Sequence, residues 1–340
     1  MAERIHPTSL KPLLAFILAV SLALVGILAA FRPGQVYPFT LEFGSLGLVT
    51  YVILGWERDA RVRLWLSGLV AGALALRALL ILAIHGGLSP YLFAPDAATY
   101  EYFGRGIVDH WRGLRELPTE IVGRWQVAHY YVNALFLYLF GNSSLGTVVL
   151  NAFLGAWTAV LSFYLGREVL GERVGRWAAM LTAFYPSLAL WSVLNIREAP
   201  TTLLVTGVVT VAVVSLRRSS GLELFLLMAG VVVLSMYRDY MAFLVTAGCL
   251  LGLFAGTRRG NKMRVLVVGS VLVFFATFAF ASLGIFERVA LENPLQTATL
   301  IREDLQRGAG SAFGLGVETL SFGQALRFLP FGLAHLLFAP

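Results

Sequence analysis

Asp96 is the residue of this 340-residue chain whose type and position most favour chemistry. It follows a long apolar segment, within the polar residues 89–102, and Tyr100 lies about one helical turn beyond it. Ionisable side chains at the edge of hydrocarbon are costly and usually have a function. We therefore interpret Asp96 as a candidate general base, which would take a proton from an acceptor hydroxyl at a membrane surface.

A structural role for Asp96 also stays open. The residue fits the N-cap of a helix whose apolar face carries Tyr100, Phe103 and Ile107. A capping side chain only has to accept a backbone N–H bond, whereas a general base has to accept a proton. Substitution by asparagine, which keeps the first ability and loses the second, separates the two interpretations.

A second acidic residue, Glu198, lies in the polar turn Asn195-Ile196-Arg197-Glu198-Ala199-Pro200 between two apolar runs. Pro200 suits the first turn of the following helix, and Glu198 complements the positive end of that helix dipole. This account does not explain Arg197, because a cation at the start of a helix is disfavoured unless an anion is close.

A third polar turn, Tyr237-Arg238-Asp239-Tyr240, has two interpretations. Arg238 and Asp239 could form a local ion pair between interfacial tyrosines. Alternatively, the planar guanidinium of Arg238 could hold a phosphate group, for which its two-pronged geometry is well suited.

Three histidines, His85, His110 and His129, share a polar loop with Asp96 and Glu101. No two of these residues have the tight spacing that is typical of metal ligands. We predict no metal and no cofactor.

The composition indicates a polytopic membrane protein. Hydrophobic residues make up 58% of the chain and charged residues only 13%, about half the charged fraction of a soluble domain. The net charge of +7 does not point to nucleic acid, because the basic residues fall in short clusters between apolar runs. The one cysteine, Cys249, lies in an apolar run and is interpreted as a core residue.

Nine apolar runs approach the roughly 20 residues that a membrane-spanning helix needs. Run 39–56 carries Glu42 and run 222–236 is short, so these two are the weaker candidates. A further run, 128–141, is too short to span and is predicted to be interfacial or re-entrant. The predicted spans are residues 13–31, 39–56, 64–84, 145–165, 177–195, 199–216, 222–236, 241–257 and 265–285.

Basic residues fix the predicted orientation. With the N-terminus inside, every inner loop carries arginine or lysine, provided that 128–141 does not cross. The same topology brings Asp96, Glu198 and Arg238 from three separate loops to the outer face. We therefore predict an all-α polytopic membrane protein with an outer loop that carries interfacial helices. The inner loops are residues 57–63, 166–176, 217–221 and 256–264.

The outer loops resemble those of the GT-C glycosyltransferases, which include the dolichyl-phosphate-mannose protein mannosyltransferases and the bacterial lipid A aminoarabinose transferases. The Pro-Asp-Ala-Ala-Thr-Tyr-Glu-Tyr stretch around Asp96 looks like the family's first outer loop. Tyr-Leu-Phe-Gly-Asn-Ser-Ser-Leu is similar to its Leu-Phe-Gly turn before a long helix. Phe-Tyr-Pro-Ser, then Trp191 and Asn-Ile-Arg-Glu, resembles the segment that ends in a second acidic residue. These stretches are residues 95–102, 138–145, 184–187 and 195–198, within 64–200.

The resemblance implies a GT-C-like helix bundle in which Asp96 matches the catalytic aspartate and Glu198 the second acidic position. It further implies an inverting sugar transfer from a polyprenyl-phosphate donor to an acceptor hydroxyl at the outer face. Arg238, with Arg197 or Arg105, would neutralise the departing phosphate. Ala97 stands where better-known members have an acidic residue, which weakens any inference of a metal. The predicted substrate-binding residues are Tyr100, Glu101, Arg105, Arg197, Arg238 and Asp239.

The expected partners are the donor, a glycan, lipid or protein acceptor, and membrane lipids. We expect an integral protein of a bacterial or archaeal plasma membrane with its active site outside. The expected organisation is an extra hairpin in 1–63, which includes a retained anchor, and a GT-C-like core in 64–285 with outer loop 85–144. Residues 286–340 are expected to form an outer tail and the start of a further, truncated helix.

Two other functions stay open. A polymerase or ligase of lipid-linked glycans would use a similar lipid phosphate and outer arginines, but its activity would not depend on Asp96. A transporter or flippase would need charged residues within the spans, of which Glu42, Arg77 and Glu223 are the evident ones.

Overall fold

The computed structural model describes residues 36–122, 124, 126–141, 145–217, 221–256 and 330. The chain divides into two compact units, 1–276 and 277–340, and the description below concerns the first. Every regular element in its described part is an α-helix, which confirms the predicted all-α class. The helices are α2 (Val36–Gly55), α3 (Ala60–Gly87), α4 (Pro90–Phe93), α5 (Asp96–Trp111), α6 (Ala128–Phe140), α7 (Leu145–Leu170), α8 (Glu172–Phe184), α9 (Pro186–Trp191), α10 (Glu198–Arg217), α11 (Gly221–Tyr237) and α12 (Asp239–Gly256).

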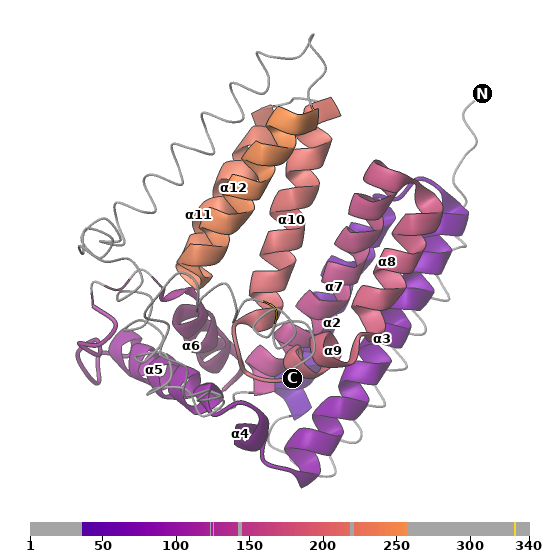
Figure 1. The fold of residues 1–340 in the computed structure, drawn as a ribbon. Coiled ribbons are helices and arrows are strands. Elements are labelled where there is room, and N and C mark those ends of the chain that lie inside the picture. The colour runs from indigo at the N-terminus through magenta and orange to yellow at the C-terminus, as the bar shows by residue number, and fades with distance from the viewer. Residues whose placement is uncertain are drawn as a thin grey trace, which may run out of the picture. The chain divides into compact units, whose positions relative to one another are not determined.

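Helices α2, α3, α7 and α8 pack side by side around one apolar core (Figure 1). Leu66 of α3 and the rings of Phe153 and Phe163 of α7 are buried in it. Helices α7 and α8 approach so closely that a Cβ added to Gly166 would lie 2.8 Å from Cα of Gly175. Glycine at both positions therefore permits the tight antiparallel pair.

Helices α10, α11 and α12 form a second group, in which Figure 1 shows them next to one another. Val208 of α10 and Leu227, Val231 and Leu234 of α11 are buried between them. Helix α10 also packs along α7, so the two groups share a contact.

Helices α5 and α6 pack against each other and have a core of their own. Ile107 and Val108 of α5 pack against Ala134 and Leu137 of α6. With 13 residues, α6 is about 20 Å long, which is shorter than a hydrocarbon core. Its length agrees with the prediction that 128–141 does not cross the membrane.

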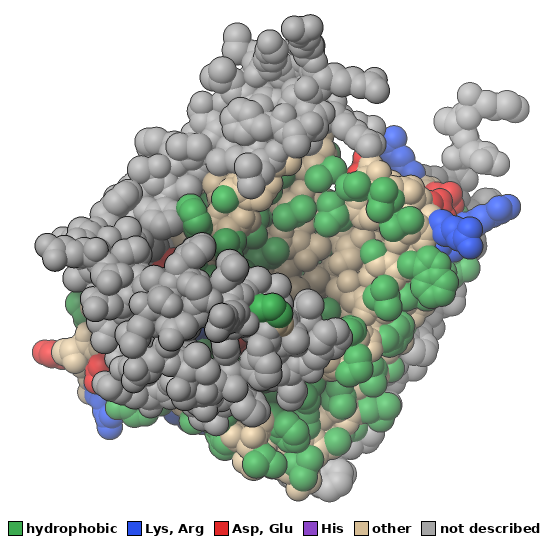
Figure 2. All heavy atoms as spheres, viewed as in Figure 1, with side chains coloured by type: hydrophobic (Ala, Val, Ile, Leu, Met, Phe, Trp, Pro, Cys, Tyr) green, Lys and Arg blue, Asp and Glu red, His purple; other side chains and the backbone are tan. Residues whose placement is uncertain are grey.

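Three described helices are long and apolar enough to span a membrane: Ala60–Gly87, Leu145–Leu170 and Glu198–Ser215. The runs at Thr40–Gly55 and Gly221–Tyr237 are shorter, as expected for the two weaker candidates. Figure 2 shows many hydrophobic side chains on the described surface that faces the viewer, as expected for helices in lipid. The predicted spans 13–31 and 265–285 lie outside the described residues.

The predicted span 177–195 is wrong as a single helix. Helix α8 ends at Phe184, and Pro186 starts the six-residue helix α9. The backbone of Tyr185 is extended, because the proline ring disfavours a helical conformation in the preceding residue. After Trp191, a non-helical segment leads to α10 at Glu198.

Two of the predicted inner loops meet at one end of the first helix group. Arg167, at the end of α7, forms an ion pair of 2.8 Å with Glu57, in the turn before α3. At the other end of α3, His85 donates from Nε2 to the carbonyl oxygen of Val193 (3.0 Å). Basic loops and the acidic candidate residues therefore lie at opposite ends of α3.

This arrangement yields a labelling prediction. Single cysteines that replace Glu116 or Arg238, in a chain without Cys249, should react with an impermeant thiol reagent from outside. A cysteine at Arg259, which lies outside the described residues, should react only after permeabilisation. Labelling of positions 238 and 259 from the same side would refute the topology.

Candidate functional site

The non-helical residues 192–197 form the floor of the candidate site, and residues 192–196 are buried. Asn151 of α7 donates from Nδ2 to the carbonyl oxygens of Leu194 and Ile196, both at 2.8 Å. Buried carbonyl groups that lack helical partners need such donors. One asparagine thus fixes the turn that presents Arg197 and Glu198.

Glu198 at the start of α10 forms an ion pair with Arg238, in the turn between α11 and α12. Arg238 also donates to the hydroxyl of Tyr240. Burial alone would lower the pKa of Arg238, but the charge of Glu198 and the contact with Tyr240 outweigh it, so the pKa is raised. The guanidinium is therefore held in place and fully charged.

The alternative of a local ion pair between Arg238 and Asp239 is wrong. Arg238 turns to Glu198, 40 positions earlier in the chain. Asp239 Oδ1 instead accepts the backbone N–H of Tyr240 (2.7 Å), which stabilises the first turn of α12.

Tyr100 links the predicted outer loop to this ion pair. Its buried ring packs with Ala97 and with Val193, Leu194 and Ile196 of the non-helical segment. Burial raises the pKa of Tyr100 above its ordinary value; the positive charge of Arg197 opposes this, and the negative charges of Glu198 and Asp96 add to it. All three charges thus lie within electrostatic reach of one hydroxyl.

The structure places Asp96 as the first residue of α5 and leaves it exposed. The predicted N-cap role is wrong, since Pro95 occupies that position and no side chain caps the helix. The proline ring before it permits the helix to begin one residue earlier than the sequence pattern indicated. Among the described residues, no hydrogen bond or ion pair occupies the Asp96 carboxylate.

Arg197 is fixed by neutral groups. Its Nη1 donates to Oε1 of Gln126 (3.2 Å) and to the carbonyl oxygen of Tyr237 (3.3 Å). Its Nε is buried and has no partner among the described residues. Arg197 thus ties the segment before α6 to the end of α11 and adds positive charge beside Tyr100.

Glu101 and Arg105 form their own cluster on α5. Arg105 Nη2 lies 2.6 Å from Oε1 of Glu101, and the hydroxyl of Tyr91 donates to Glu101 Oε2 (3.2 Å). No contact in the described part of the chain joins them to Arg238. Of the predicted set, Asp96, Tyr100, Arg197, Glu198 and Arg238 are linked by contact or charge, whereas the bonds described above for Glu101, Arg105 and Asp239 are with other groups.

The three histidines have separate environments. His85 contacts the Val193 carbonyl, His110 pairs through Nδ1 with the Arg115 carbonyl oxygen (3.2 Å), and His129 is buried against Tyr100, with 4.6 Å between ring centroids. Within the described ranges, no three histidine, cysteine or acidic residues are grouped as metal ligands.

The sequence analysis did not predict the hydrogen bonds of the buried amide side chains near the site. Asn195 Nδ2 donates to Asn133 Oδ1 (2.7 Å), and Thr147 donates to the same oxygen (3.2 Å). These bonds join α6, α7 and the non-helical segment. The available signal was the presence of Asn133 and Asn151 within otherwise apolar runs, where an amide needs an internal partner.

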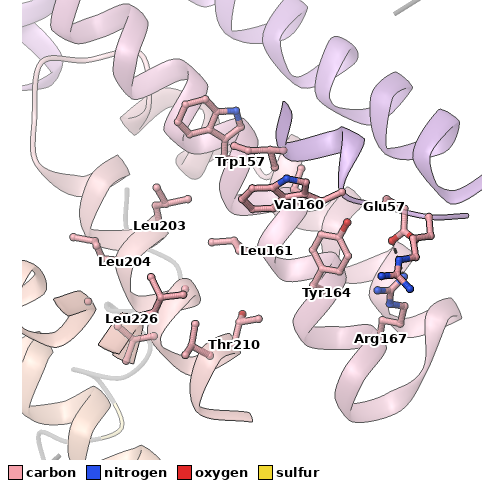
Figure 3. A pocket seen from close by; sticks show the side chains of 17 residues that line it. Glu57, Trp157, Val160, Leu161, Tyr164, Arg167, Leu203, Leu204, Thr210 and Leu226 are labelled. Carbon is pink, nitrogen blue, oxygen red and sulfur yellow. Dashed lines mark hydrogen bonds and ion pairs between the residues drawn. The ribbon is translucent and has the colours of Figure 1, made fainter. Parts of the chain in front are cut away.

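A groove of about 840 Å³ lies between α7, α10 and α11 (Figure 3). Leu161 of α7 faces Leu203 and Leu204 of α10 across it. The Glu57–Arg167 ion pair lies at one side of the groove in Figure 3. The groove thus combines apolar walls with charge at its margin.

Comparison with known proteins relates part of the chain to a class of enzymes. Residues 127–282 match the model of the dolichyl-phosphate-mannose-protein mannosyltransferase family. These residues form a GT-C type glycosyltransferase domain. The match supports a membrane glycosyltransferase, and it confirms the resemblance seen in the sequence.

The match includes Glu198 and Arg238 but begins after Asp96. No curated protein and no solved structure matched the chain.

The burial of His129 yields a pH prediction. Burial lowers the pKa of His129 from 6.5 to about 3; the Asn195 amide opposes the shift weakly, without hydrogen-bond geometry, and Arg197 adds to it. The unfolded chain therefore binds the extra proton between these values, so stability is full above pH 6.5 and falls as the pH is lowered. The expected slope is up to about 1.4 kcal/mol per pH unit.

His129→Gln should flatten this dependence of Tm on pH in detergent. His110→Gln is the matched control, because His110 is exposed. Equal slopes for the wild type and His129→Gln below pH 6.5 would contradict a buried neutral imidazole.

Proposed function

We propose that this glycosyltransferase transfers a sugar from a polyprenyl-phosphate donor to an acceptor hydroxyl at the outer membrane face, with inversion at the anomeric carbon. The observation that carries the proposal is the meeting of Asp96, Glu198 and Arg238, from three separate polar segments, around Tyr100. A carboxylate with no partner among the described residues and a fixed guanidinium, both acting electrostatically on Tyr100, suit a reaction that removes a proton and releases a phosphate.

Arg238 is the proposed phosphate-binding residue. Its charge is maintained by Glu198, and its side chain is 22% exposed, so it is partly accessible to a ligand. A guanidinium in this setting stabilises the negative charge that develops on the lipid phosphate as the sugar leaves. Arg197 adds a second positive charge close by.

The groove between α7 and α10 supports a lipid-linked donor. Leu203, which lines it, follows Glu198 by five residues, about 7.5 Å along the helix axis. Helix α10 thus begins with a charged residue, and apolar residues that line the groove follow about one and a half turns later. A phosphate near Arg238 and a polyprenyl chain along Leu203 and Leu204 would match this order.

Asp96 is the proposed general base. The carboxylate is exposed at the start of α5, where an acceptor can approach from water. Direct displacement by an acceptor hydroxyl requires one proton acceptor and one stabilised leaving group, which Asp96 and Arg238 would supply. The acceptor can be a glycan, a lipid or a protein.

Arg238→Ala should weaken donor binding by roughly 30-fold, corresponding to about 2 kcal/mol for one lost charged partner. Arg238→Lys should recover part of the affinity, because lysine keeps the charge and loses the two-pronged geometry. The measurement is equilibrium binding of a polyprenyl-phosphate sugar in detergent. Arg115→Ala, an exposed arginine in the outer loop, controls for general surface charge. Normal donor binding by Arg238→Ala would remove Arg238 from the proposed site.

Asp96→Asn should reduce transfer by about 10²–10⁴-fold and leave folding and donor binding intact. Asparagine is nearly isosteric but cannot accept a proton, and Asp96 makes no capping hydrogen bond that the change would remove. Transfer from a polyprenyl-phosphate sugar is measured in liposomes, with Tm recorded alongside.

Asp109→Asn is the matched control, since it makes the same change on the same helix. Near-normal transfer by Asp96→Asn would reject the mechanism and favour a polymerase or ligase.

A further inference from the structure

Arg77 of α3 is fully buried, with 0% of its surface exposed. Its Nε donates to Ser192 Oγ (2.8 Å), and its Nη1 donates to the carbonyl oxygens of Ala73 (3.1 Å) and Ala183 (2.9 Å). Its Nη2 is buried and has no partner among the described residues. Because a buried charge with an unpaired N–H is costly, this group calls for a further ligand.

A cavity of about 100 Å³ lies beside this guanidinium. Holding one water takes roughly 10–15 Å³, so the cavity has room for several. Its lining joins α3, α7, α8, α9 and α10, and Glu198 is the one acidic residue in that lining. Arg77 and Glu198 therefore line the same small cavity.

The hydrogen-bond balance of the lining selects the ligand. The hydroxyl protons of Thr158, Thr182, Ser192 and Thr202 are already donated to backbone carbonyl oxygens of their own segments. These hydroxyls thus offer only lone pairs to the cavity, and Arg77 offers only an N–H. An anion would find one donor and a repelling carboxylate, and a cation would face Arg77. Water alone both accepts from Nη2 and donates to the oxygens.

We propose that Arg77 is a positioning residue for Glu198, acting through water in this cavity. The water accepts from Arg77 Nη2 and donates to the Glu198 carboxylate, whose Oε1 binds Arg238. Glu198 is then held between two guanidinium groups and directs Arg238 at the donor phosphate. The role of Arg77 in donor binding rests on the proposed function, but the water-mediated connection between Arg77 and Glu198 does not.

Gly155 of α7 shows how tightly the Arg77–Ser192 pair is fitted. A Cβ at this position would lie 2.8 Å from Ser192 Cβ and 2.9 Å from Arg77 Nε. Both are closer than real Cβ contacts, so Gly155→Ala must displace the pair while keeping its charge and hydroxyl.

The test is a double-mutant cycle in thermal stability of the full chain. Arg77→Gln and Glu198→Gln should each lower Tm, and the double variant should lose less than the sum by roughly 2 °C or more. Arg77→Gln with Asp109→Asn should be additive. Additive losses for Arg77 and Glu198 would overturn the proposal.

If Arg77→Gln does not fold, the cycle of Gly155→Ala with Glu198→Gln replaces it. The double variant should again lose less Tm than the sum of the two single losses. Additive losses would overturn the proposal. Gly68→Ala on α3, where an added Cβ meets nothing within 4 Å, is the control.

Donor binding gives the functional readout. Arg77→Gln should weaken binding of a polyprenyl-phosphate sugar roughly three- to tenfold, and Arg77→Lys should restore part of it. In a Glu198→Gln background the same change should have no effect, whereas a purely structural role would weaken both. If the wild type does not bind this donor, the proposed function fails and the thermal cycle still decides the link.

Discussion

The non-helical segment 192–197 is the constraint on which the site depends. Its backbone carbonyl groups leave the helical pattern inside an apolar bundle, so each needs another donor. His85 donates a hydrogen bond to the carbonyl oxygen of Val193, and Asn151 donates to those of Leu194 and Ile196. These donors come from α3 and α7, two of the three candidate spans. These two helices therefore determine where the irregular segment presents its charged residues.

The same segment connects the outer helices to the bundle. The Asn195 amide holds α6 through Asn133, and the Glu198 carboxylate holds the turn between α11 and α12 through Arg238. Tyr100 of α5 belongs to the same buried cluster as Val193, Leu194 and Ile196 of the segment. A change that unravelled it would thus release the predicted outer loop, the proposed phosphate-binding residue Arg238 and the start of α10 together. This explains why residues from distant parts of the chain share one location.

The sequence predicted what depends on periodicity and on loop charge. The long apolar runs of α3, α7 and α10 appear as helices, and polar turns predicted for one face meet around Tyr100. Tertiary pairing was not predictable in the same way: Asp239 is adjacent to Arg238 in sequence, yet Arg238 turns to Glu198. Asn151, placed in an apolar run, gave no indication of which carbonyls it serves. Local patterns specify elements, whereas buried polar groups are satisfied by whichever partner the packed fold supplies.

The contacts also separate the two acidic residues of the site. Glu198 gives one carboxylate oxygen to Arg238, and protonating it would weaken the bond that fixes this arginine. Asp96 is exposed at the start of α5, and no partner in the described part of the chain competes for its lone pairs. Two carboxylates in different surroundings can thus have different roles, one as proton acceptor and one as ion-pair partner, as paired acids in enzymes often do. In the proposed mechanism Asp96 would therefore take the proton, and Glu198 would hold Arg238, the proposed partner of the donor phosphate.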